Sequence, residues 1–181
     1  MGYLKMYSQI EAHLTKIPVK PLRTNNIRNT LINLIKTYEE DIYRIRLLSY
    51  RWEDIKINDK KFLDFLKKLA ISRGVTITLI TGENPINRKK LRKVKKAFRE
   101  LIKVGVSVFY NKKAHLKLAI IESERKNFII MMSSNITHGG LYYHYEIGIL
   151  MIPNTQIYNY IIDYVNEIIS DSKAIDIGEL R

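Results

Sequence analysis

Short apolar segments alternate with amphipathic helical patterns along most of this sequence. Val75–Ile80 and Val106–Tyr110 are apolar runs of strand length, whereas Asn26–Glu40 and Asp59–Arg73 repeat apolar residues every three or four positions. This alternation is typical of a sheet covered by helices, because each helix packs its apolar face on neighbouring strands. We therefore predict an α/β fold with a mixed β-sheet flanked by helices.

The chain has 181 residues, which is the size of one ordinary domain, and 46% of them are apolar. Residues 1–25 are expected to form a short helix and a linker, because two prolines in Ile17–Arg23 interrupt helical spacing. Residues 26–181 are expected to form a single domain, with Thr24 or Asn25 as the cap of its first helix.

Further strands are predicted over Ile42–Trp52 and Asn127–Met132, and a last helix over Gln156–Ser170. The sequence has no cysteine, which excludes disulfides and Cys-based metal sites. No apolar run approaches the roughly 20 residues that span a bilayer. We expect a cytoplasmic protein without stable membrane insertion and without a cofactor.

Two polar residues accompany another expected strand. His115 and Lys117 are two positions apart, so in a strand their side chains point to the same face. Leu116 and Leu118 then point into the opposite layer. A nucleophile and a cation therefore share one surface.

A second polar group follows the apolar segment Asn127–Met132. Ser133 and Asn135 come where this strand breaks into a loop, and Glu146 lies eleven residues after the asparagine. If the two strands pair, the hydroxyl and the amide are held beside the histidine and the lysine.

This arrangement resembles the signature of the phospholipase D-like superfamily, which reads His-x-Lys, four residues, Asp, then Gly-Ser-x-Asn and a downstream Glu. Two framework positions differ here, because Glu122 stands in the Asp position and Met132 in the Gly position. The residues that match are His115, Lys117, Ser133, Asn135 and Glu146.

The resemblance implies a role for each matching residue. His115 attacks phosphorus to give a phosphohistidine, Lys117 and Asn135 hold the non-bridging oxygens, and Ser133 adds a hydrogen bond. Glu146 accepts the proton of the other imidazole nitrogen and so fixes the tautomer. No metal is required by this mechanism.

The leaving oxygen also needs an acid, which the resemblance implies is a second imidazole. The chain holds one motif, so a two-fold homodimer is expected to supply it. His13, His138 and His144 have no comparable residues around them and are interpreted as surface or turn residues.

The most polarised segment is Asn87–Lys103, a predicted helix with an apolar stripe and many basic residues. The formal net charge is +13 and the pI about 9.8, which favours a polyanionic partner, DNA or RNA, over a membrane surface. The basic residues expected to bind nucleic acid are Arg88, Lys89, Lys90, Arg92, Lys93, Lys95, Lys96 and Arg99.

Two further segments are given structural interpretations. Glu122 to Lys126 looks like a solvated hairpin tip. Tyr142, Tyr143 and Tyr145 alternate through an expected strand entry, so that some pack in the core and others could stack on bases.

The sequence thus predicts a metal-independent phosphodiesterase, a nuclease similar to the single-motif endonucleases of the superfamily. Within the enzyme class, a lipid or small-phosphodiester hydrolase is the alternative. From another class, the alternative is a nucleic-acid-binding module that keeps the fold without turnover.

Overall fold

The computed structural model describes residues 18–57, 60–86 and 92–180. Within these ranges, eight strands form one sheet in the order β1-β9-β8-β7-β2-β5-β6-β10. The strands are β1 (Val19–Arg23), β2 (Ile42–Ser49), β5 (Thr76–Thr81), β6 (Ser107–Tyr110), β7 (Leu118–Ser123), β8 (Asn127–Met132), β9 (Ile147–Met151) and β10 (Lys173–Ala174). The helices are α2 (Thr24–Thr37), α3 (Phe62–Arg73), α4 (Arg92–Ile102) and α5 (Thr155–Ser170). The small elements are β3 (Lys56–Ile57), β4 (Lys60–Lys61), a π-helical turn η2 (Gly139–Tyr143) and a 3-10 turn η3 (Ile177–Leu180).

The sheet is mixed. β2, β5 and β6 run parallel to one another, whereas the other neighbouring pairs are antiparallel. The parallel strands are joined through α3 and α4, as parallel connections require, and a short hairpin joins β7 to β8. The predicted α/β fold with a mixed, helix-flanked sheet is confirmed.

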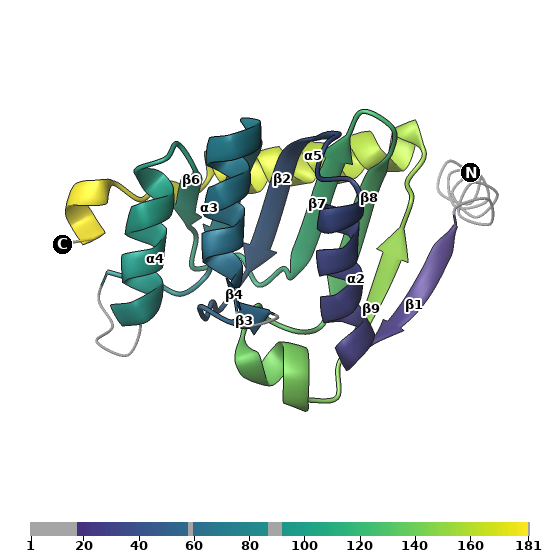
Figure 1. Ribbon diagram of the computed structural model, residues 1–181, viewed down its shortest axis with the longest axis horizontal. Coiled ribbons are helices and arrows are strands. Elements are labelled where there is room, and N and C mark those ends of the chain that lie inside the picture. Colours follow the sequence, from purple (N-terminus) through teal and green to yellow (C-terminus); the bar gives the residue numbers. More distant parts are fainter. Residues whose placement is uncertain (1–17, 58–59, 87–91, 181) are drawn as a thin grey trace, which may run out of the picture.

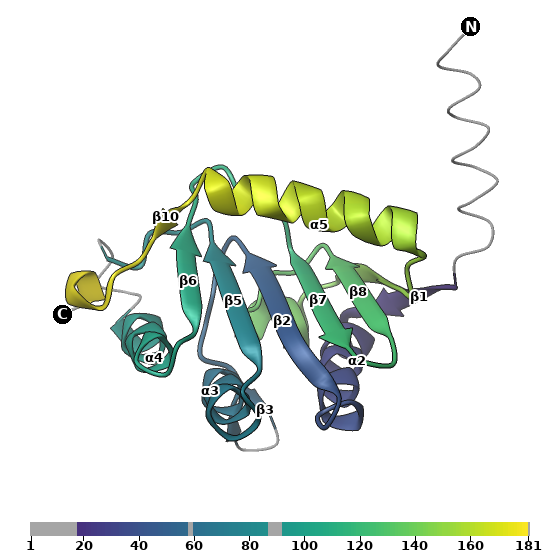
Figure 2. The same ribbon diagram turned by 90° about the horizontal axis from the view of Figure 1, so that it is seen from above.

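Helices cover both faces of this sheet (Figures 1 and 2). α2, α3 and α4 pack on one face, and α5 crosses the other. Ala119 and Ile121 of β7 belong to the core under the first three helices, while Leu118 and Ile120 pack with α5. Because both faces of β7 are buried, its first four residues, Leu118 to Ile121, are all apolar. Of the helices that the structure describes, none combines the length and apolar character needed to cross a membrane.

Most predicted elements lie within a few residues of the observed ones. Asn127–Met132 is β8 without any shift, and the helix predicted over Gln156–Ser170 is α5. α3 ends at Gly74 as expected, and the φ of 65° there favours glycine. The strand predicted over Ile42–Trp52 is shorter in the structure, because β2 ends at Ser49.

The linker predicted near the amino terminus is wrong where the structure describes it. Val19–Arg23 forms β1, an edge strand that pairs antiparallel with β9. Pro21 is compatible with this place, because an edge strand has one side without a neighbouring strand. The sheet therefore begins before the predicted domain boundary, and the helix expected earlier lies outside the described residues.

For β9 only an entry near Tyr142–Tyr145 was expected, without bounds, and β10 was not predicted. Tyr142 and Tyr143, expected at the entry to a strand, lie in the turn η2 instead. Tyr145 lies two residues before the start of β9, and its side chain is fully exposed. A turn with π-helical hydrogen bonding is rare, so periodicity gave no reason to expect it.

Glu122 is buried near the end of β7 instead of lying on a solvated hairpin tip. Its side chain is 1% exposed, accepts hydrogen bonds from Arg46 and the phenol of Tyr158, and lies 3.4 Å from Arg44. Burial and the hydrogen bond to Glu122 raise the pKa of Tyr158 to about 12, so the phenol remains a donor at neutral pH. A buried ion pair is sensitive to the loss of either partner, because the remaining charge has no compensation.

Replacing Glu122 by glutamine should lower the free energy of unfolding by about 3 kcal/mol, because Arg46 is left with an uncompensated buried charge. Glu124→Gln is the matched control: Glu124 is exposed, and its replacement should change stability by less than about 0.5 kcal/mol. Urea denaturation followed by circular dichroism measures both. Equal effects of the two substitutions would show that the buried pair has no special role.

Candidate functional site

The motif residues meet at one edge of the sheet. β2, β5 and β8 end at this edge, and β7 and β9 begin there. Leu118 at the start of β7 pairs with Leu48 near the end of β2 and with Met131 near the end of β8. The strands that carry the two halves of the motif pair with each other, as the sequence argument required. The motif residues at this edge are His115, Lys117, Ser133, Asn135 and Glu146.

His115 and Lys117 lie directly before β7, not inside a strand as predicted. The carbonyl of Lys117 still accepts a hydrogen bond from the backbone N–H of Met132 at 3.0 Å, which continues the ladder. Leu116 and Leu118 both pack in the core under α5, so the expected alternation of side chains holds. His115 is exposed, and the ammonium of Lys117 donates to its carbonyl at 2.8 Å.

The His115 ring stacks on Tyr50, a residue that the sequence analysis did not single out. The two ring centroids are 4.0 Å apart, with an angle of 23° between the planes. Tyr50 follows β2 directly, and a Cβ on the neighbouring Gly82 would lie only 2.0 Å from its ring. Gly82 therefore makes room for the ring that supports His115. Only the position of Tyr50 after a strand adjacent to β7 could have indicated this contact.

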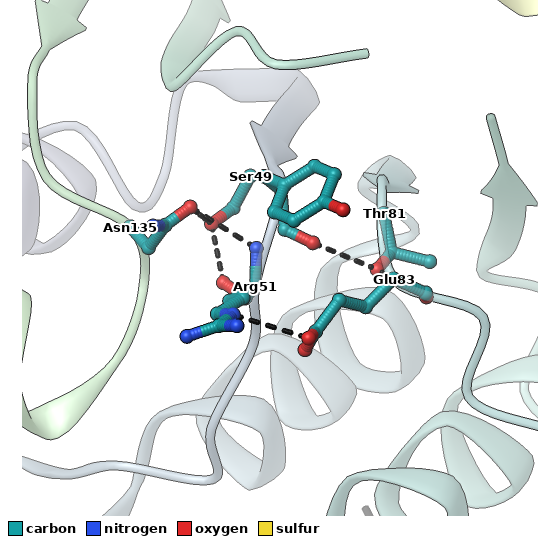
Figure 3. A network of polar contacts seen from close by, with 6 residues as sticks. Ser49, Arg51, Thr81, Glu83 and Asn135 are labelled. Atoms are coloured by element: carbon teal, nitrogen blue, oxygen red, sulfur yellow. Dashed lines mark hydrogen bonds and ion pairs between the residues drawn. The ribbon is translucent and has the colours of Figure 1, made fainter. Parts of the chain in front are cut away.

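The side-chain oxygen of Asn135 is held by the segment that follows β2 (Figure 3). Oδ1 accepts a hydrogen bond from the backbone N–H of Arg51 at 3.0 Å and lies 3.4 Å from the Ser49 hydroxyl. The Arg51 guanidinium in turn pairs with Glu83 at 3.1 Å. With its oxygen engaged, the amide offers its NH₂ group as a donor at the site edge.

Ser133 and Glu146 form a pair of their own. The Ser133 hydroxyl donates to the Glu146 carboxylate and accepts from the backbone N–H of Ile147 at 3.0 Å. Thr24, expected to cap α2, instead accepts a hydrogen bond from the Glu146 backbone N–H at 2.9 Å. Among the described residues, the hydrogen bond of this carboxylate goes to Ser133 and not to the motif histidine. Its role in fixing the imidazole tautomer stays a prediction.

The side chains of Met132 and Glu122, the two residues that differ from the family signature, point away from the other motif residues or lie far from them. Met132 is 8% exposed and packs in the main core, so the large side chain fills space between the sheet and its helices. Glu122 lies near the end of β7 that is opposite the site. Among the described residues, no group of three or more His, Asp or Glu side chains is arranged to hold a metal ion.

Part of the predicted nucleic-acid-binding helix is observed as α4. Its apolar stripe faces the core through Val94, Phe98 and Leu101. Residues 88–90 lie outside the described part of the chain. In α4, the exposed basic residues are Arg92, Lys93 and Lys96, and the half-buried ones are Lys95 and Arg99.

Sequence comparison agrees with this geometry. Residues 31–169, most of the chain, match the family described as cardiolipin synthase, PLD-like domain. The chain belongs to the phospholipase D-like family. Members of this family are phosphodiesterases, and the resemblance drawn from the motif is confirmed. Comparison with curated proteins gave no match.

Several solved structures share the fold. Nuc of Salmonella typhimurium, a phospholipase D family member, is 13% identical and superposes with a TM-score of 0.66 over 88% of this chain and 99% of Nuc. NucT of Helicobacter pylori is 15% identical, with a TM-score of 0.65 over 88% of this chain and 100% of NucT. Phosphatidylserine synthase of Haemophilus influenzae is 16% identical, with a TM-score of 0.62 over 91% of this chain and 42% of that protein.

Tyr50→Ala should release the His115 ring. Given the nucleophilic role predicted for His115, this should lower kcat on a small activated phosphodiester by about tenfold or more, because the imidazole loses its orientation. Tyr50→Phe keeps the stacked ring and should retain most of the activity. Nuclear magnetic resonance of the His115 imidazole protons gives an independent measurement, since the neighbouring ring shifts them upfield in the wild type and in Tyr50→Phe only. If both substitutions move these resonances equally, the stacking account is wrong.

Proposed function

We propose that the protein is a metal-independent phosphodiesterase that cleaves nucleic acid through a phosphohistidine at a site shared by two copies of the chain. The observation that carries this proposal is the presence of His115, Lys117 and Asn135 at one sheet edge, in a member of a phosphodiesterase family. The set offers a nucleophile, a cation and an amide donor, which are the groups that attack on an anionic phosphorus requires.

In the first step, an imidazole nitrogen of His115 attacks phosphorus and forms a P–N bond. The bond from phosphorus to the leaving oxygen breaks, and that oxygen takes a proton from an imidazolium. Lys117 and the NH₂ group of Asn135 stabilise the charge on the non-bridging oxygens. In the second step, water attacks phosphorus and gives a proton to the imidazole that acted as the acid. The P–N bond breaks, the phosphate monoester leaves, and both histidines are restored.

The acid is His115 of a second copy of the chain. Of the other described histidines, His138 stacks within the turn η2, and the His144 ring packs against Gly139. A two-fold dimer that joins the two site edges would place one motif histidine opposite the other. One histidine then serves as the nucleophile and its mate as the acid, and a mechanism with one base and one acid predicts a bell-shaped pH–rate profile.

Charge favours nucleic acid as the substrate. The formal net charge of +13 attracts any polyanion. The exposed basic residues of α4, and Arg51 directly beside Asn135 with 58% of its side chain exposed, supply contacts for the phosphates that flank the scissile bond. The Ser133–Glu146 pair orients a hydroxyl at the same edge.

The protein should cleave labelled single-stranded or duplex nucleic acid in excess EDTA, because the proposed mechanism uses imidazole and ammonium groups in place of a metal ion. His115→Ala should abolish the cleavage. Gel analysis of both proteins with DNA and RNA substrates makes the measurement. Activity that disappears with EDTA and returns with Mg²⁺ would contradict the mechanism, and hydrolysis of phospholipid without any nucleic-acid cleavage would contradict the substrate.

A further inference from the structure

A cleft of about 800 Å³ lies beside the site edge, and we name it the flanking cleft. Its apolar lining consists of Trp52, Ile55 and Val94, each of them buried. Charged side chains of both signs surround this lining: the cations are Arg51, Arg92 and Lys93, and the carboxylates are Glu53, Asp54 and Glu83. The flanking cleft therefore combines an apolar floor with a charged rim, which is the usual composition of a pocket for a small polar ligand.

The flanking cleft is continuous with the candidate site through Arg51. The backbone N–H of Arg51 holds the side-chain oxygen of Asn135, while its guanidinium lines the cleft and pairs with Glu83 (Figure 3). A substrate phosphate bound by Asn135 would thus have its neighbouring nucleotide at the mouth of the cleft.

An aromatic pair stands on the rim of the cleft. The rings of His138 and Tyr143 are parallel to within 3°, with centroids 5.0 Å apart. His138 lines the cleft, and Tyr143 is 75% exposed. Tyr142, in contact with His138, has the Arg28 guanidinium 4.2 Å from its ring centroid. The stack therefore presents an exposed aromatic surface, and one guanidinium lies against the neighbouring Tyr142 ring.

The turn that carries this pair is fixed to the residue that holds the phosphate. The backbone N–H of Thr137 donates to the carbonyl of Asn135 at 2.8 Å, and a Cβ on Gly140 would lie 2.6 Å from the same carbonyl. The backbone N–H of His138 donates to the Glu53 carboxylate at 2.7 Å. The aromatic pair and Asn135 therefore belong to one tightly connected loop.

We propose that the flanking cleft and the His138–Tyr143 pair bind an unpaired nucleotide next to the scissile phosphate, so that the substrate is single-stranded nucleic acid. This inference rests on the proposed function. An exposed aromatic face can stack on a base that has left its neighbours, whereas the bases of an intact duplex have no face to offer. The apolar floor accepts a base, and the arginines and lysine beside it accept the phosphates.

Binding is tested in His115→Ala chains, which cannot cleave the probe. The probes are a short fluorescein-labelled single strand, its duplex, and a single strand of abasic nucleotides with the same number of phosphates. Fluorescence anisotropy in EDTA should show tighter binding of the single strand than of the duplex. Adding Tyr143→Leu should weaken single-strand binding by about tenfold, the usual contribution of one stacked base. The same substitution should leave binding of the abasic strand unchanged.

Tyr160→Leu is the matched control, because Tyr160 is 76% exposed but lies on α5 across the sheet. It should leave single-strand affinity unchanged. The inference is overturned if Tyr143→Leu and Tyr160→Leu have equal effects, or if Tyr143→Leu weakens abasic and normal strands equally. Binding to anionic vesicles that depends on Tyr143, without binding to single strands, would overturn it as well.

Failure of the proposed function is detected separately. Wild-type protein that hydrolyses neither nucleic acid nor a small activated phosphodiester would refute catalysis. The anisotropy measurement uses chains without the nucleophile, so it decides the nucleotide subsite whichever way the catalytic test comes out.

Discussion

The buried hydroxyl of Ser49 joins two strand ends that the sheet itself keeps apart. β2 and β8 are separated by β7 in the strand order, yet the Ser49 hydroxyl accepts a hydrogen bond from the backbone N–H of Ile136 at 2.9 Å and donates to the Arg51 carbonyl. The bridge between Trp52 and Ile136 continues the connection. Because of these bonds, Asn135 lies beside the end of β2, and its place in the candidate site depends on this contact.

The two ends of β7 differ in the kind of residue they carry. At its start, the chain enters with His115 and Lys117, which are exposed or half-buried and available to a ligand. Near its end, Glu122 is buried in an ion pair with Arg46, away from solvent. The ion pair joins β2 to β7. Rigid strands hold His115 and Asn135 in a constant relation to each other.

The sequence predicted the position of an element or site residue wherever apolar residues were periodic or several motif residues matched one spacing pattern. The apolar run of β8 and the spacing from His115 to Asn135 were enough to predict that the motif residues lie at strand ends on one side of the sheet. Contacts that depend on the ends of other strands were not predictable: no periodicity links Tyr50 to His115, or Ser49 to Asn135. The burial of Glu122 was missed for a related reason. Its basic partners, Arg44 and Arg46, lie on β2, and the phenol that bonds to it belongs to Tyr158 on α5.

The most direct test of the account is whether one site needs the motif histidine of two chains. Wild-type and His115→Ala chains are mixed, refolded so that dimers form at random, and checked for complete exchange by mass spectrometry. Mixtures of wild type with Glu124→Gln serve as a control that should lose no activity. A shared site predicts activity per total protein that follows the square of the wild-type fraction, because only all-wild-type dimers hold both nucleophile and acid. A linear dependence would contradict the account.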